Sequence, residues 1–97
     1  MKAKLILHTK EVKGDEIIEI KIWKVQKSKS YPDGVKFSLV YIEKGKRIIG
    51  YDNGEGKGYH RHYLDKEDPY DFKNIQKLLN DFKIEVLRLR GRDWDED

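Results

Sequence analysis

Residues 35–51 read VKFSLVYIEKGKRIIGY, and this stretch decides the fold. Apolar side chains occupy alternate positions from Val35 to Tyr41, while Val40 and Ile42 add apolar side chains of the opposite parity. This pattern predicts a central strand that is covered on both faces. Lys44-Gly45 then supplies a tight two-residue turn, so the residues that follow are expected to form a second strand that pairs antiparallel with the first.

Two more strands are predicted upstream of this hairpin. Leu5 to Thr9 is a short strand candidate, and Lys13-Gly14-Asp15 supplies the turn that should join it to the next strand. Glu16 to Val25 carries isoleucines at alternate positions opposite charged residues, which is typical of a strand with one buried face. The apolar residues change face at Trp23-Lys24-Val25, which indicates a bulge or a strand that runs past the edge of the core.

A fifth strand and a helix are predicted downstream. Residues 52–58 contain three glycines and are expected to form a loop, after which Tyr59 to Leu64 alternates again. The acidic segment from Leu64 to Pro69 is interpreted as a connection. From Ile75 the apolar residues recur at spacings of three and four, the pattern of an amphipathic helix, and Asn74 is its expected N-cap.

Together these patterns predict an α+β fold, with an antiparallel sheet of about five strands packed by one C-terminal amphipathic helix. A chain of 97 residues has room for one hydrophobic core. We therefore expect a single domain over residues 1–92, followed by an acidic, flexible tail over residues 93–97.

Composition excludes several classes of protein. The chain has no cysteine, so it has no disulfides and no thiolate site. The longest run without a charged residue is Phe37 to Ile42, far below the roughly 20 apolar residues that span a bilayer. No apolar signal segment follows the N-terminus, so a cytoplasmic location is expected. Charged residues make up 40% of the chain, which is typical of thermophile proteins with ion-pair networks.

The charge is unevenly distributed along the chain. Residues 1–63 carry 14 Lys and Arg against 8 Asp and Glu, a net charge of +6, whereas residues 64–97 carry 7 against 10, a net charge of −3. The basic half contains the predicted sheet. This asymmetry favours a polyanion such as RNA or DNA as a partner, although a lysine-rich solvated face explains it almost as well.

Candidate functional residues are concentrated between Tyr51 and His62, where two of the three histidines occur. If Tyr59 to Leu64 is a strand, His60 and His62 project from the same face with Cα atoms about 6.5–7 Å apart, and Arg61 points the other way. Histidine titrates near neutrality, so two imidazoles on one face are suited to act as general base and general acid in phosphodiester cleavage. This chemistry requires no metal and no other cofactor.

Neighbouring residues complete the predicted site. Asp52 is expected to orient one imidazole, while Lys57 and Arg61 are expected to stabilise phosphate charge. Backbone N–H groups of Gly56 and Gly58 are placed to cradle a phosphate oxygen. Tyr59 shares the face of Arg61, where its ring is suited to stack on a base.

Other interpretations of the same residues stay open. The histidines are also consistent with a solvent-facing pair, or with a metal site completed by Asp52, Glu55 or His8. The glycines are equally suited to shaping a tight connection. Lys57 and Arg61 are consistent with ordinary surface charges, and Tyr59 with a core residue.

Segments spread over nearly the whole chain match the pattern of one protein family. They are Met1 to Ile6, Ile22 to Val25, Tyr41 to Tyr51, Tyr51 to Asn53, Gly56 to His62, Glu67 to Phe72 and Leu78 to Phe82. In these segments the chain resembles the small TumE-type proteins, the toxin members of prokaryotic toxin–antitoxin pairs. In that family an acidic residue usually precedes His-Arg-His, and this chain has Tyr59 there.

The resemblance implies a toxin with a cognate antitoxin, usually a helix-turn-helix DNA-binding protein encoded by the neighbouring gene. Combined with the histidine pair, it favours RNA as the target and endonucleolytic hydrolysis by a metal-independent ribonuclease as the activity. Two alternatives remain, a non-catalytic nucleic-acid-binding module and a protein that inhibits a cellular target by binding it. The sequence does not determine the oligomeric state.

Overall fold

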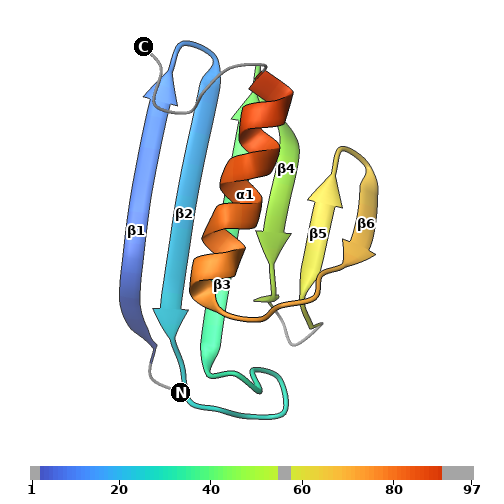
Figure 1. Cartoon of the computed structure of the whole chain (residues 1–97). Helices are drawn as coiled ribbons and strands as arrows, with labels where there is room; N and C mark the ends of the chain where they lie inside the picture. Colours follow the sequence, from blue (N-terminus) through green and yellow to red (C-terminus); the bar gives the residue numbers. More distant parts are fainter. Residues whose placement is uncertain (1–2, 55–57, 91–97) are drawn as a thin grey trace.

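The described part of the chain forms six antiparallel strands and one helix (Figure 1). The computed structural model describes residues 3–54 and 58–90, so the tail predicted over residues 93–97 lies outside them. The elements are β1 (Lys4–Lys13), β2 (Glu16–Lys24), β3 (Val35–Glu43), β4 (Lys46–Asp52), β5 (His60–Tyr63), β6 (Lys66–Pro69) and α1 (Ile75–Arg90). The strands follow one another across the sheet in chain order.

The α+β class and the C-terminal helix are confirmed, and the sheet has one strand more than expected. The additional strand is β6, which pairs with β5 over a segment interpreted above as a connection. Its four residues, Lys66-Glu67-Asp68-Pro69, are all exposed, so they carry no apolar alternation that would predict a strand. A short, charged edge strand that ends in proline also resists pairing with other chains.

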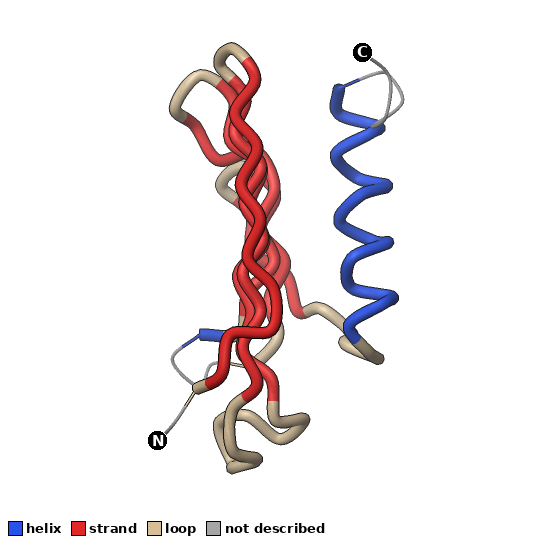
Figure 2. Tube along the Cα trace, turned by 90° about the vertical axis from the view of Figure 1, so that its left-hand side faces the viewer, coloured by secondary structure: helices blue, strands red, loops and turns tan. Residues whose placement is uncertain are grey.

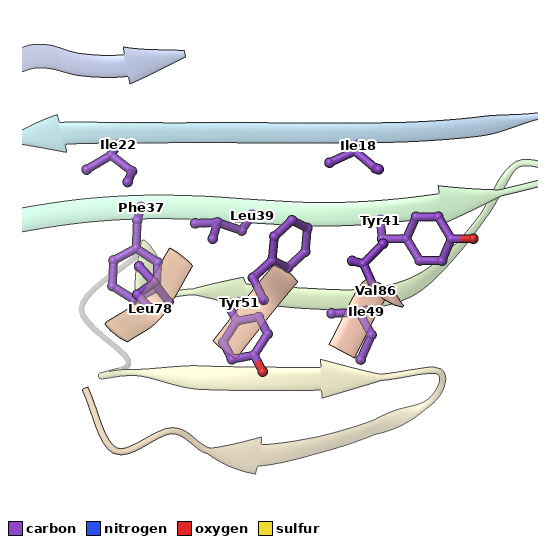
Figure 3. Packing of buried hydrophobic residues seen from close by; sticks show 10 residues of the cluster. Ile18, Ile22, Phe37, Leu39, Tyr41, Ile49, Tyr51, Leu78 and Val86 are labelled. Atoms are coloured by element: carbon purple, nitrogen blue, oxygen red, sulfur yellow. The ribbon is translucent and has the colours of Figure 1, made fainter. Parts of the chain in front are cut away.

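Helix α1 lies against one face of the sheet only, and Figure 2 shows the opposite face without a covering helix. Between α1 and the sheet lies the core, built from alternate residues of β2, β3 and β4 and one side of the helix (Figure 3). The fully buried members include Leu39, Tyr41 and Ile49 from the sheet and Leu78 and Val86 from α1. Burying a side chain of this size stabilises the fold by about 1.5–3 kcal/mol.

The prediction that the central strand is covered on both faces is wrong. In β3 only Phe37, Leu39 and Tyr41 are buried within the strand, and the residues of the other parity, Val40 and Ile42, are half-buried. These two side chains lie on the face that α1 does not cover. Apolar residues at both odd and even positions of β3 therefore indicate a central strand of the sheet, and they do not indicate that both faces are covered.

Local signals predicted the turns and the helix start correctly. Lys44 and Gly45 both adopt positive φ values, 52° and 77°, as a two-residue hairpin turn requires. The N–H of Lys77 donates a 2.8 Å hydrogen bond to Oδ1 of Asn74, which therefore caps α1 as predicted. The irregularity expected near Trp23 lies in the neighbouring strand, where the register shifts between Leu5 and Leu7. Among the described residues, no helix is long and apolar enough to cross a membrane.

Candidate functional site

Strand β5 places the two histidines and the arginine of His-Arg-His on opposite faces of the sheet. Arg61 is paired with Tyr51, whose side chain is buried under α1, so Arg61 lies on the helix face. His60 and His62 are paired with Asp52 and Gly50 and lie on the other face. We call this second face, which α1 does not cover, the open face. The predicted alternation in β5 is therefore confirmed.

Four side chains form what we call the histidine cluster: Asp52, His60, His62 and Glu67. The two imidazole centroids are 6.5 Å apart, and the ring planes are tilted by 36°. Nε2 of His62 lies 3.0 Å from Oδ2 of Asp52 and 3.8 Å from Oε2 of Glu67. The same Glu67 oxygen lies 3.2 Å from Nδ1 of His60, so this carboxylate contacts both rings.

Both imidazoles remain accessible from solvent. The exposed fraction is 23% for the His60 side chain and 15% for that of His62, whereas Glu67 is about half exposed at 51%. A carboxylate beside one ring nitrogen favours the tautomer that carries the proton on that nitrogen. The two carboxylates therefore influence which nitrogen of each ring is protonated.

The position of Asp52 is fixed by its two neighbours in the sequence. Tyr51 is buried in the core, and Asn53 is 1% exposed. The N–H of Phe37 donates to Oδ1 of Asn53, and Nδ2 of Asn53 donates to the carbonyl of Val35, both at 2.8 Å. This side chain continues the hydrogen bonding between β3 and the end of β4, so the backbone on both sides of Asp52 is held.

Glu67 was not among the predicted site residues. It reaches the histidines because β6 pairs with β5 in a register that places Glu67 opposite His62. The available signal was a two-residue turn, Leu64-Asp65, after Tyr63, followed by four residues that fit a short edge strand. That signal is weak without the structure, because no apolar residue fixes the register.

Arg47 is a second residue that the sequence analysis missed. It pairs with Ile42 beside a register shift in β4, and its side chain lies over Gly50 on the open face. A Cβ atom on Gly50 would lie 3.1 Å from Cδ of Arg47 and 3.7 Å from Nη1. Because Gly50 has no side chain, the guanidinium of Arg47 can lie close to it. Gly50 is paired with His62, so the guanidinium lies one strand away from this histidine.

Arg61 is engaged on the helix face. Its Nε donates a 2.7 Å hydrogen bond to Oε1 of Glu85, and its Nη2 donates to Oε2 of the same carboxylate. The hydroxyl of Tyr51 also donates to Glu85. Burial raises the pKa of the Glu85 carboxyl above its ordinary value, and the nearby Arg88 acts in the opposite direction. The structure does not bring Arg61 together with the histidine cluster.

Tyr59 also lies apart from the histidines, in an aromatic stack. Its ring centroid is 4.8 Å from that of Phe72 and 5.9 Å from that of Phe37, with nearly parallel planes. Burial, together with a hydrogen bond to Asp33, raises the pKa of Tyr59 to about 12. This environment is that of a packing residue.

The remaining predicted residues belong to the loop before β5. Gly58 is exposed and has a φ of 83°, a backbone conformation that residues with a Cβ rarely adopt. Gly56 and Lys57 lie outside the described residues, as does Glu55, so their predicted roles stay predictions. Within residues 3–54 and 58–90, no group of three or more His, Cys, Asp or Glu side chains is arranged to hold a metal ion.

The third histidine, His8, is not part of the cluster. It lies in β1, where its Nε2 is 2.9 Å from Oε2 of Glu19, and its side chain is 43% exposed. Like His62, His8 lies on the sheet next to a carboxylate, but the two carboxylates are different residues. No contact of His8 with a second imidazole is found among the described residues.

Comparison with known proteins identifies the family. The family model described as Toxin TumE matches residues 2–90 of the chain. No curated protein and no solved structure matches it. The match includes all six strands, the helix and every residue of the histidine cluster. Because it covers nearly the whole chain, this protein belongs to the TumE toxin family.

Proposed function

We propose that this toxin cleaves RNA, with His60 and His62 as its general acid/base pair. The observation that supports the proposal best is the histidine cluster: two partly exposed imidazoles, 6.5 Å apart on the open face, each next to a carboxylate. A single phosphodiester fits between rings at this separation. The pair then acts on both sides of one phosphorus atom, as acid/base cleavage requires.

In the proposed reaction, one histidine takes the proton of a ribose 2′-hydroxyl while the 2′-oxygen attacks the adjacent phosphorus. The other histidine gives a proton to the departing 5′-oxygen as the P–O bond breaks. The products are a 2′,3′-cyclic phosphate and a 5′-hydroxyl, and no oxidant or other co-reactant is needed. Asp52 holds His62 in one orientation, and Glu67 acts on both rings.

Charge on the phosphate needs a cation on the same face as the histidines. Arg47 meets this condition, because its guanidinium lies next to Gly50, the residue paired with His62. Lys57 keeps the phosphate role predicted from the sequence, together with the backbone of Gly56 and Gly58. The phosphate role predicted for Arg61 has less support, because that guanidinium is bound to Glu85 on the helix face.

The test compares three histidine variants. His60→Ala or His62→Ala should each lower the cleavage rate by a factor on the order of 10²–10⁴ and leave RNA affinity nearly unchanged, because acid/base groups act mainly in the transition state. His8→Ala is the matched control, since His8 also has a carboxylate partner on the sheet. It should cleave like the parent.

Two further measurements separate this mechanism from its rivals. Cleavage should persist in EDTA, and its rate should pass through a maximum as the pH is varied, because one histidine must be neutral and the other protonated. RNA binding without cleavage would instead indicate a non-catalytic binding module. If His60→Ala and His62→Ala remain as toxic in cells as the parent, the acid/base proposal is wrong and a toxin that inhibits a protein target becomes the better interpretation.

Membership of this toxin family implies a cognate antitoxin as partner. We propose that this antitoxin is a helix-turn-helix DNA-binding protein, as the sequence resemblance implies. Co-expression of the toxin with the product of the neighbouring gene tests the assignment. The two proteins should purify together and growth should be restored, whereas a neighbouring product without a helix-turn-helix that neutralises the toxin would contradict it.

A further inference from the structure

We infer that a single strand of RNA crosses the open face of the sheet from the histidine cluster to Trp23, where one of its bases stacks on the indole ring. This inference deepens the proposed function and rests on it, because the path begins at the proposed site of cleavage. It concerns binding outside the histidine cluster, and none of the residues along the path is needed for proton transfer.

Trp23 is a large aromatic residue without a role in the core. It lies on β2, and the buried cluster and the apolar residues packed against it do not include it. Its residue partners in neighbouring strands are Leu5 of β1, which is 52% exposed, and Lys36 of β3. The Nζ atom of Lys36 lies 5.6 Å from the centroid of the indole ring. A partly exposed aromatic ring beside a cation is the combination that binds single-stranded nucleic acid.

The strand register connects Trp23 with the histidine cluster along one face. Lys36 is paired with Trp23, and two residues further along β3 Ser38 is paired with both Lys21 and Asp52. Asp52 is in turn paired with His60. Three strand spacings and a two-residue step along the strand separate Trp23 from His60, a distance of about 16 Å. A few nucleotides of single strand can span it.

The cations of the two faces differ in how many of them are paired with carboxylates. On the helix face, Arg61, Lys77 and Arg90 are each paired with a carboxylate, so phosphate would have to displace an existing partner. On the open face, Lys21 is paired with Glu19, but Arg47 and Lys36 form no ion pair within residues 3–54 and 58–90. Charge complementarity to a phosphate backbone therefore favours the open face, and the aromatic ring on that face favours bases over other polyanions.

The experiment uses Trp23 as its own reporter. Trp94 is the only other tryptophan in the chain, so in a Trp94→Phe variant the fluorescence comes from Trp23 alone. The probe is a short single-stranded oligoribonucleotide with 2′-O-methyl groups, which lacks the attacking hydroxyl and cannot be cleaved. Binding of the labelled probe is followed by anisotropy in the same titration. Emission from Trp23 should be quenched with the same midpoint as the anisotropy change.

Variants add a second readout. Trp23→Ala should weaken binding on the order of 10-fold, and Trp23→Phe should retain most of the affinity because it keeps an aromatic ring. Lys36→Ala should also weaken binding, whereas Lys73→Ala, the same change in the linker before α1, should not. Circular dichroism establishes that each variant is folded.

The outcomes separate this inference from the proposed function. Binding that leaves Trp23 emission unchanged would overturn the path across the open face, even if His60→Ala and His62→Ala abolish cleavage. If the probe does not bind at low salt, the inference also fails. Failure of the proposed function has its own signature, which is toxicity that survives both histidine substitutions.

Discussion

The two carboxylates of the histidine cluster are held to different degrees. Asp52 lies between buried Tyr51 and buried Asn53, so its backbone has little freedom. Glu67 lies on the edge strand β6 and is half exposed, yet it contacts both imidazoles. We therefore expect Asp52 to fix one ring and Glu67 to position the rings relative to each other.

Glu67→Gln tests this role at the level of one residue. The variant keeps the shape of the side chain and removes its charge, so the cleavage rate should fall roughly 10-fold, less than for either histidine, because an exposed charge is screened by solvent. The fall should appear in kcat, with KM retained, and the pH of maximal rate should shift. Asp68→Asn is the matched control, because Asp68 is paired with Arg61 and so lies on the helix face. A pH profile identical to that of the parent would exclude the positioning role.

At the level of elements, β5 has two roles: it carries the histidines, and it contacts α1. Its histidines lie on the open face, while Arg61 binds Glu85 of α1 and so connects the strand to the helix. The core holds β5 less firmly, because Tyr63 packs against it but no residue of the strand is fully buried. The ion pair therefore stabilises the position of the strand that carries the histidines.

Substitution of this ion pair should affect stability more than chemistry. Arg61→Met removes the guanidinium from Glu85 and leaves the hydrogen bond from Tyr51, so the free energy of unfolding should fall by about 2 kcal/mol, below the value for fully buried pairs because Arg61 is 29% exposed. A double variant with Glu85→Leu should recover part of this loss. Urea unfolding measures both effects. Cleavage by the folded Arg61→Met protein should match the parent, and a specific loss of activity would restore the predicted phosphate role of Arg61.

A second contact between elements involves Asp81 of α1. Its Oδ2 accepts hydrogen bonds from Tyr70, at 2.6 Å, and from Lys77, at 2.8 Å. Burial disfavours the carboxylate, but the bonds from Lys77 and Tyr70 outweigh burial and hold the pKa of Asp81 below its ordinary value. The folded state thus binds a proton less readily than the unfolded chain.

This lowered pKa predicts how the contribution of Asp81 depends on pH. The stabilisation is complete above roughly pH 4, where a free aspartate is ionised, and it is lost as the pH falls through the lower folded value. Asp81→Asn should cost about 1–2 kcal/mol at pH 7, and the difference from the parent should shrink at pH 3. Unfolding in urea at the two pH values measures this. Asp71→Asn, in a pair that is largely exposed, should change little, and a pH-independent cost at Asp81 would contradict the prediction.

Local patterns account for most of what the sequence predicted at this level. His60 and His62 share a face because the two-residue period of a strand does not depend on its neighbours. The capping of α1 by Asn74 and the turn at Lys44-Gly45 are equally local. Glu67 and Arg47 escaped prediction because their positions depend on how β6 pairs with β5 and on a register shift in β4, and neither follows from the order of residues alone.

For the whole molecule, the important feature is that only one face of the sheet is covered. The helix face contributes the core and the Arg61–Glu85 and Arg90–Glu16 ion pairs, so these residues are occupied with folding. The open face carries the histidine cluster, Trp23 and Arg47, which contribute little to the core. The net charge of +6 over residues 1–63 belongs to the part of the chain that forms β1 to β5, whereas α1 lies in the acidic part. The residues that stabilise the fold and those proposed to bind RNA thus lie on different faces.

This division predicts a salt dependence for RNA binding. Two cations on the open face, Lys36 and Arg47, are placed to contact phosphates, and each phosphate contact with a single strand contributes a slope of about −0.7 to the plot of log affinity against log salt concentration. Two contacts give a slope of about −1.4, so affinity should fall roughly 7-fold between 50 and 200 mM salt. Anisotropy titrations at several salt concentrations measure the slope. Arg47→Ala should make it shallower by about 0.7, whereas Arg88→Ala, a change of the same charge on α1, should leave it unchanged. If the slope is close to zero, phosphate contacts do not drive binding, and a protein target becomes the better explanation of toxicity.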